Sequence, residues 1–171
     1  MLTMTSPPDA EHQQIDRLLT VARETIAAVR YCWVATRAED GGANARAVLS
    51  LAGAPGSDEW TRRFLTHRGS RKVAEIRRDP RVTLAYQANT GDSYVALAGV
   101  AHLVDDKAEM RSLWQANVVK VLDDAVATGM IVVRIDVHRI EIHARGVTAE
   151  PFGHGRTLIE RDAVGAWHFT T

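Results

Sequence analysis

The sequence predicts a mainly β (α+β) fold, a small antiparallel barrel with peripheral helices. About six strand-like segments follow one another without the alternating strand–helix rhythm of a parallel sheet. Helical segments are inserted after the third and the fifth of these strands. With 171 residues, the chain has the length of one domain, and we expect a single domain over residues 1–171.

The N-terminal segment is expected to be a loose end followed by a helix. Residues 1–8 include Ser6, Pro7 and Pro8, which are typical of an irregular terminus. From residue 9 to residue 29, apolar residues recur at helical spacing. They are Ile15, Leu18, Leu19, Ala22 and Ile26. This pattern predicts a helix that packs one face against the barrel.

A β-hairpin is predicted next. The β-branched and aromatic segment 31–36 and the alternating segment 44–51 flank the turn sequence at residues 39–42. In the second arm, Arg46 shares a face with the apolar Val48. An arginine in this position either extends its charged head to solvent from an edge strand or binds an anion, and the residues alone leave both open.

The stretch from Phe64 to Arg81 carries the strongest functional signal. Between Arg62 and Arg81 there are eight Lys or Arg residues and two acids. A strand ends near Thr66, a turn follows, and Ser70 is predicted to be the N-cap of a helix that Pro80 ends.

A helix start of this kind favours a phosphate. The backbone amides of Arg71 and Lys72 lack intrahelical partners and lie at the positive end of the helix dipole. Their side chains, with the hydroxyls of Thr66 and Ser70, add donors for an anion. The alternative is that Ser70 only caps a surface helix whose basic residues form a solvated face.

The remaining segments complete the barrel. Segment 81–87 alternates as a half-buried strand, whereas segment 94–104 is apolar on both parities and is expected to be covered on both faces. Gly99 within it indicates a bulge or a close backbone approach. A helix is predicted from Asp105, and segment 118–128 is expected to be partly helical.

The last long strand, residues 130–143, changes the parity of its apolar residues near His138. This change predicts a bulge or a sharp bend, by which a barrel strand turns a corner. Residues 145–171 are expected to form a C-terminal extension that ends in an amphipathic segment.

Composition excludes several classes of protein. With 21 basic and 21 acidic residues, a pI near 7.1 and few aromatics, neither nucleic acid nor a membrane surface is expected as a partner. No apolar run is long enough to span a bilayer and no secretory signal is visible, so we expect a cytoplasmic protein. The lone Cys32 is expected to be a buried, inert thiol. The seven histidines lack the spacing of a zinc site, and we expect no metal.

An ordered set of short motifs resembles a known family. The set is Arg46-Ala47-Val48, Phe64-Leu65-Thr66, Ser70-Arg71-Lys72, Asp79-Pro80-Arg81-Val82 and Tyr94-Val95-(x)3-Gly99. It resembles the pyridoxamine 5'-phosphate oxidase-like, FMN-binding split-barrel superfamily, and within it the general stress protein branch. The resemblance extends from about Ile26 to Ile142 and implies an antiparallel six-stranded split β-barrel.

The resemblance also implies a cofactor site. Arg46 would reach the phosphate or ribityl part of FMN, and Val48 would lie along the flavin ring. Leu65 and Thr66 would contact the isoalloxazine through backbone and hydroxyl groups. The phosphate would be bound by Ser70, Arg71 and Lys72, and Tyr94 stands where the oxidases carry a glutamine that touches the cofactor. The implied assembly is a homodimer with the flavin, FMN or alternatively FAD, in a cleft between subunits.

Two departures argue against vitamin B6 oxidase activity. Leu51 replaces the lysine that binds the substrate phosphate in the oxidases, and their C-terminal Arg-Leu-His segment is missing. In addition, His143 lies near the position of a tryptophan that is usual in the stress protein branch.

Three functions therefore stay open. The first is a flavin-dependent oxidoreductase of unidentified small-molecule substrate, for which no catalytic acid or base can be named. The second is a flavin carrier or stress sensor without turnover. The third is a haem-binding relative on the same fold, with a histidine as axial ligand.

Overall fold

The computed structural model describes residues 7–51, 56–88, 93–116, 129–148 and 157–170. The chain divides into two compact units. One comprises Met1–Val29, Ala85–Leu97 and His138–Thr171, and the other comprises Arg30–Leu84 and Ala98–Val137. Three strands continue from one unit into the other, and a single domain over residues 1–171 stays a prediction.

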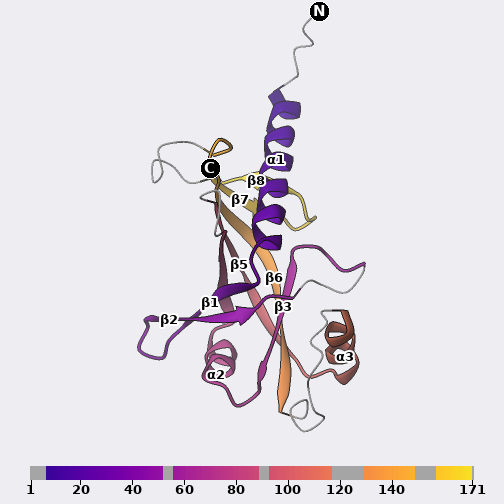
Figure 1. Cartoon of the computed structure of the whole chain (residues 1–171). Helices are drawn as coiled ribbons and strands as arrows, with labels where there is room; N and C mark the ends of the chain where they lie inside the picture. Colours follow the sequence, from indigo (N-terminus) through magenta and orange to yellow (C-terminus); the bar gives the residue numbers. More distant parts are fainter. Residues whose placement is uncertain (1–6, 52–55, 89–92, 117–128, 149–156, 171) are drawn as a thin grey trace, which may run out of the picture. The chain divides into compact units, whose positions relative to one another are not determined.

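The described residues form eight strands and three helices (Figure 1). The strands are β1 (Tyr31–Arg37), β2 (Ala43–Leu49), β3 (Thr61–His67), β4 (Arg81–Gln87), β5 (Tyr94–Val104), β6 (Met130–His143), β7 (Thr157–Arg161) and β8 (Trp167–Phe169). The helices are α1 (Pro7–Ala27), α2 (Arg71–Arg78) and α3 (Lys107–Ala116). The hydrogen-bonded strand order is β2-β1-β4-β5-β6-β7-β8, with β3 paired to β6, so the sheet does not close. This agrees with the predicted split barrel, to which β7 and β8 add two strands.

The β1–β2 hairpin is confirmed. The two strands pair antiparallel, with Val34 opposite Arg46 and Cys32 opposite Val48. Along β2, exposure alternates as a half-buried strand requires, and Arg46 and Val48 share the more buried face. Cys32 is buried, as predicted.

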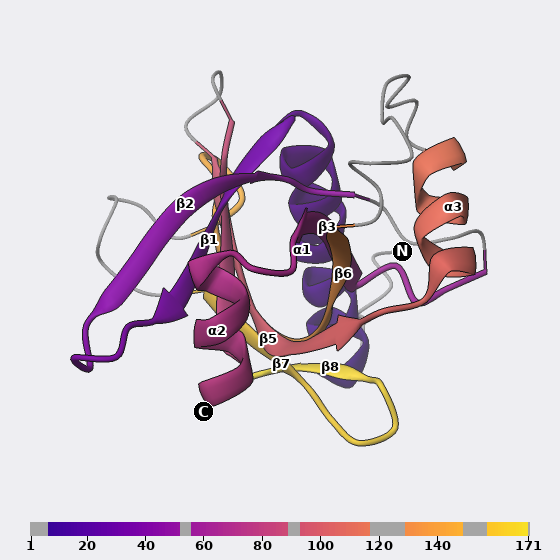
Figure 2. The ribbon, with the colours of Figure 1, turned by 90° about the horizontal axis from the view of Figure 1, so that it is seen from below.

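Helix α2 begins and ends where its sequence predicts. Ser70 is the N-cap residue, with extended backbone angles of φ −74° and ψ 150°. Val73 and Ile76 are buried, and the helix ends before Pro80, which cannot continue it. Figure 2 shows α2 beside the β1–β2 hairpin, and this packing brings the basic stretch onto the hairpin.

Gly99 confirms a close backbone approach. A Cβ at this position would lie 2.7 Å from the backbone oxygen of Asp136 and 2.7 Å from Cγ2 of Ile135. The prediction that β5 is covered on both faces holds for one face. Val95, Leu97, Gly99 and Ala101 are buried, whereas the residues that alternate with them are half-buried, because the described part of this chain does not fully cover that side.

The parity change in β6 is confirmed as well. His138 and Arg139 are consecutive exposed residues, and buried residues lie on opposite parities before and after them. Among the described residues, no helix is long and apolar enough to cross a membrane.

A small apolar core in the second unit joins α3 to the strands. Leu51, Leu113 and Val132 are buried together, and Leu65 packs against them. Helix α3 is capped by Asp106, whose Oδ1 accepts hydrogen bonds from the amides of Ala108 and Glu109. The predicted helical part of segment 118–128 lies outside the described residues.

In the other unit, α1 begins two residues earlier than the sequence indicates, at Pro7. Its buried face includes Ile15, Leu18 and Ala22, and Thr25 is buried there while Ile26 is half-buried. The amphipathic tail forms the β7–β8 hairpin. Residues 1–6 of the predicted loose terminus lie outside the described residues.

Candidate functional site

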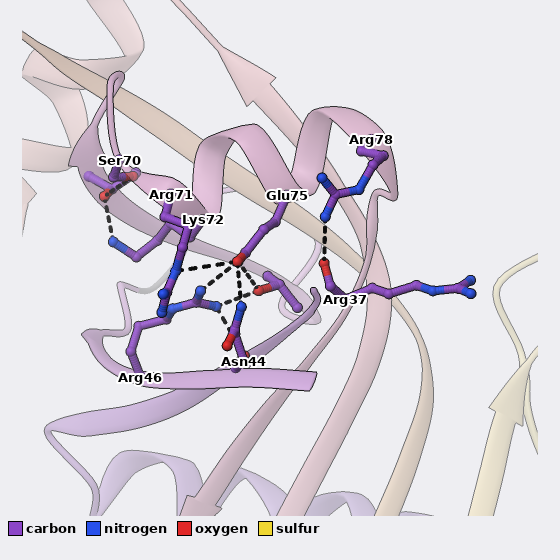
Figure 3. A network of polar contacts seen from close by, with 10 residues as sticks. Arg37, Asn44, Arg46, Ser70, Arg71, Lys72, Glu75 and Arg78 are labelled. Atoms are coloured by element: carbon purple, nitrogen blue, oxygen red, sulfur yellow. Dashed lines mark hydrogen bonds and ion pairs between the residues drawn. The ribbon is translucent and has the colours of Figure 1, made fainter. Parts of the chain in front are cut away.

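A buried carboxylate, that of Glu75, connects α2 to the β1–β2 hairpin (Figure 3). It accepts hydrogen bonds from Thr36 Oγ1 at 2.6 Å and from Asn44 Nδ2 at 2.6 Å. Arg46 Nη2 lies 2.5 Å from Glu75 Oε2 and completes an ion pair. Thr36 and Asn44 are direct partners across the hairpin, which explains why both reach the same carboxylate.

The charge state of Glu75 follows from these contacts. Burial by itself raises the pKa of a carboxyl group, but the hydrogen bonds from Thr36, Arg46 and Asn44 and the charge of Arg46 outweigh it. The pKa of Glu75 therefore lies below its ordinary value. Glu75 is a buried anion whose charge is paired, as a buried charge must be.

Arg46 is the residue that the sequence left between two interpretations. Its side chain is only 19% exposed, so the interpretation in which Arg46 extends its charged head to solvent from an edge strand is excluded. Nη1 donates to Thr36 Oγ1 and, at 3.1 Å, to the backbone oxygen of Asn44, while Nη2 donates to Glu75. Within the part of the chain that the structure describes, these bonds use three of the five N–H groups of the guanidinium and leave two for another acceptor.

The N-terminus of α2 carries a second group of donors. Lys72 Nζ donates to Thr66 Oγ1 at 3.0 Å, and the hydroxyls of Thr66 and Ser70 share a hydrogen bond of 3.3 Å. Ser70 occupies the predicted N-cap position, but its side chain makes no capping hydrogen bond, because it pairs with Thr66 instead. Within the described part of the chain, the backbone amides of Arg71 and Lys72 have no acceptor.

Lys72 is a partly buried cation near a second cation, Arg46. Burial lowers the pKa of its ammonium, the nearby charge of Arg46 lowers it further, and Glu75 only partly compensates. An anion placed among these groups would relieve the repulsion. The arrangement can therefore bind a small anion such as a phosphate.

Arg71 contributes a solvent-exposed cation. Its side chain is 74% exposed, and its Nε lies 3.4 Å from Glu75 Oε1, one helical turn away. Glu75 is buried, but the guanidinium is mostly in solvent and the 3.4 Å contact is long, so this pair contributes little and Arg71 is free to turn to another acceptor.

The structure gathers five of the eight predicted site residues in one place: Arg46, Thr66, Ser70, Arg71 and Lys72. Val48 is buried on the same hairpin face as Arg46. The Leu65 side chain is half-buried and packs against the apolar core that contains Val132, its partner on β6. Tyr94 lies in the other unit, where its ring stacks on that of His143 with 5.5 Å between centroids.

Sequence reasoning missed Glu75, Thr36 and Asn44. The available signal was Glu75 itself, one of only two acids in the basic stretch and placed one turn after Arg71. The two positions at which the sequence departs from the family pattern are both buried in the structure. Leu51 is a core residue, and His143 is a buried ring that also contacts Thr148. Among the described residues, no group of three or more His, Cys, Asp or Glu could hold a metal.

Comparisons with known proteins agree with this fold. The chain matches the family model described as pyridoxamine 5'-phosphate oxidase like over residues 18–144. Among curated protein sequences, none matches the chain significantly.

Solved structures with a similar fold include three of interest. An FMN-binding protein related to pyridoxamine 5'-phosphate oxidase from Nostoc punctiforme PCC 73102 is 17% identical, with a TM-score of 0.61 and coverage of 95% of each chain. A protein related to general stress protein 26 from Clostridium acetobutylicum is 13% identical, with a TM-score of 0.63 and coverage of 85% of this chain and 95% of that chain. A haem-binding protein from Mycobacterium smegmatis is 19% identical, with a TM-score of 0.55 and coverage of 73% of this chain and 53% of that chain. At such identities the likeness establishes the fold alone.

Proposed function

Because this chain belongs to the pyridoxamine 5'-phosphate oxidase-like family, we propose that it binds FMN and acts as a flavin-dependent oxidoreductase on a small molecule. The observation that carries the proposal is the group of donors at the N-terminus of α2. This group comprises Lys72 Nζ, of whose three N–H groups one is donated to Thr66, the paired hydroxyls of Thr66 and Ser70, and the backbone amides of Arg71 and Lys72. This donor set suits a phosphate monoester, the group that ends the side chain of FMN.

The chain's residues bind and orient the cofactor in this proposal. Lys72, Ser70, Arg71 and the free N–H groups of Arg46 hold the phosphate. Val48 and the backbone of Leu65 lie along the ring. FMN, when bound, supplies the electron and hydride transfer.

The proposed substrate is not pyridoxamine phosphate. Leu51, which replaces the substrate lysine of the oxidases, is buried in the apolar core with Leu113 and Val132. A side chain in that position offers nothing to a substrate phosphate, and this supports a different small molecule.

We propose further that the protein is a cytoplasmic homodimer in which the second copy completes the flavin site. Two large apolar side chains on β1 support an association between copies, since Tyr31 is 56% and Trp33 57% exposed. On the strand paired with β1, Ala47 lies opposite Trp33 and extends the apolar face.

An absorption spectrum during flavin titration tests the proposal. We expect flavin bands that shift on binding of FMN, bleaching by NADH or NADPH, and recovery on addition of an oxidising substrate. Bound flavin that no reductant bleaches would indicate a carrier or sensor. A Soret band after haem addition, without flavin binding, would indicate the haem-binding alternative, for which the Mycobacterium smegmatis protein offers the same fold.

A further inference from the structure

The proposed phosphate site contains an anion of its own. Of its three basic side chains, two pair with Glu75: Arg46 Nη2 at 2.5 Å and Arg71 Nε at 3.4 Å. Lys72 donates to Thr66 instead. A site built only to attract a phosphate would not need a buried carboxylate among its cations.

Glu75 is held on the hairpin by hydrogen bonds to both of its carboxylate oxygens. Thr36 Oγ1 and Asn44 Nδ2 each hold one carboxylate oxygen at 2.6 Å, and Thr36 is itself buried. Both donors are fixed by the register of the β1–β2 hairpin. Figure 3 shows the Arg46 guanidinium against this carboxylate, so a phosphate bound next to Arg46 would share the guanidinium with Glu75.

We propose that Glu75 is the internal counter-anion of this site, and that its carboxylate competes with the phosphate of the ligand for the Arg46 guanidinium. It stabilises the half-buried Arg46 in the unliganded protein and lowers the affinity for flavins that carry a phosphate. Riboflavin, which has the same ring but no phosphate, escapes this competition. The inference rests on the proposed flavin site and names the residue that sets its phosphate affinity.

The conservative variant Glu75→Gln separates charge from position. Glutamine keeps an oxygen that can accept from Arg46 and has the same length, so the guanidinium stays oriented, while the negative charge is lost. Dissociation constants for FMN and riboflavin are measured by flavin fluorescence quenching. The ratio of the two constants gives the contribution of the FMN phosphate to the binding affinity. We expect E75Q to bind FMN about tenfold more tightly and riboflavin as the wild type does.

A charge-matched control is Glu39→Gln. Glu39 is an exposed acid whose side chain is 93% accessible, near Arg78 at the other end of α2. E39Q changes the net charge by the same amount and is expected to leave both dissociation constants unchanged. An equal gain in E39Q would show that net charge alone is responsible and would overturn the inference.

Two further outcomes would overturn it. Weaker FMN binding by E75Q, with riboflavin unaffected, would mean that Glu75 only positions Arg46. In the Arg46→Gln background, E75Q should lose most of its gain, and a gain that persists there in full would exclude competition for Arg46.

Inorganic phosphate provides a readout that does not depend on flavin. We expect phosphate to raise the melting temperature of E75Q more than that of the wild type, and equal shifts would overturn the inference. If E75Q folds poorly, Glu75→Asp, whose side chain is one methylene shorter, provides a second test. We expect phosphate to raise its melting temperature more than that of the wild type, but by a smaller difference than in E75Q. Failure of the wild type to bind either flavin would reject the proposed function, whereas the phosphate series would still decide the role of Glu75.

Discussion

Arg46 of β2 and Glu75 of α2 form an ion pair, with 2.5 Å between Nη2 and Oε2, that joins the hairpin to the helix. The two residues lie 29 positions apart in the chain. Thr36 and Asn44 bind the same pair, so the network holds α2 against the hairpin. Its predicted consequences concern both cofactor binding and stability.

Removal of the cations should abolish the proposed flavin binding and leave the proposed dimer intact. Each charge-assisted hydrogen bond contributes about 1.5–3 kcal/mol, so Lys72→Ala should weaken FMN binding by roughly 10-fold to 150-fold. The double variant Lys72→Ala/Arg46→Ala should be purified without flavin. Fluorescence titration and size-exclusion chromatography measure the two properties.

Arg77→Ala is the matched control for this prediction. Arg77 is an exposed arginine in the last turn of the same helix, far from its N-terminus. It should bind FMN like the wild type. Unchanged FMN affinity in the double variant would contradict the assignment of the site.

Acid should remove the contribution of Glu75 to stability. The folded state lowers the pKa of this carboxyl below its unfolded value, so the unfolded chain takes up a proton first as pH falls. The stabilisation is complete above the ordinary pKa of glutamate, about 4.3, and is lost as pH decreases through the lower folded value. Urea midpoints of the wild type and E75Q between pH 7 and pH 3 measure it.

The comparison with E75Q isolates one group, because the other carboxyls titrate in both proteins. The wild type should be the more stable at pH 7, and the difference should shrink below about pH 4. A difference in urea midpoint between the wild type and E75Q that stays constant from pH 7 to pH 3 would contradict the predicted contribution of Glu75 ionisation to stability.

Local patterns in the sequence were sufficient for most of the fold. Ser70 and Pro80 mark the start and the end of α2. Alternation along β2 predicts that Arg46 and Val48 share one face. The change of parity near His138 predicts the irregularity in β6. Each of these features depends on residues close together in the chain. Secondary structure and half of the site were therefore predictable.

The rest of the site depends on packing between distant segments. Thr36 and Glu75 are 39 positions apart and meet only because α2 packs on the hairpin. A lone glutamate in a basic helix has the pattern of a surface residue, and its burial could not be read from spacing. The pairing of the Ser70 hydroxyl with Thr66, four residues earlier, has a local cause: it depends on how the turn between them orients the two side chains, which residue spacing does not give.

Gly99 should not tolerate a side chain. A Cβ here would lie 2.7 Å from the backbone oxygen of Asp136, which cannot move without distorting β6. We expect Gly99→Ala to reduce the free energy of unfolding by about 1–3 kcal/mol. Gly42→Ala is the control, since its Cβ would meet only the exposed Asp40 side chain at 3.1 Å. Equal urea midpoints for both variants would contradict the close approach.

Restoring the oxidase lysine at position 51 should not create a vitamin B6 oxidase. Leu51 is 3% exposed and packs with Leu113 and Val132, so the ammonium of Leu51→Lys would be buried without a partner. We expect a loss of several kcal/mol in the free energy of unfolding, and no formation of pyridoxal phosphate from pyridoxamine phosphate. Leu51→Met, which nearly conserves volume, should cost less than about 1.5 kcal/mol. A stable L51K protein that oxidises pyridoxamine phosphate would show that residue 51 faces the substrate, contrary to its place in the core.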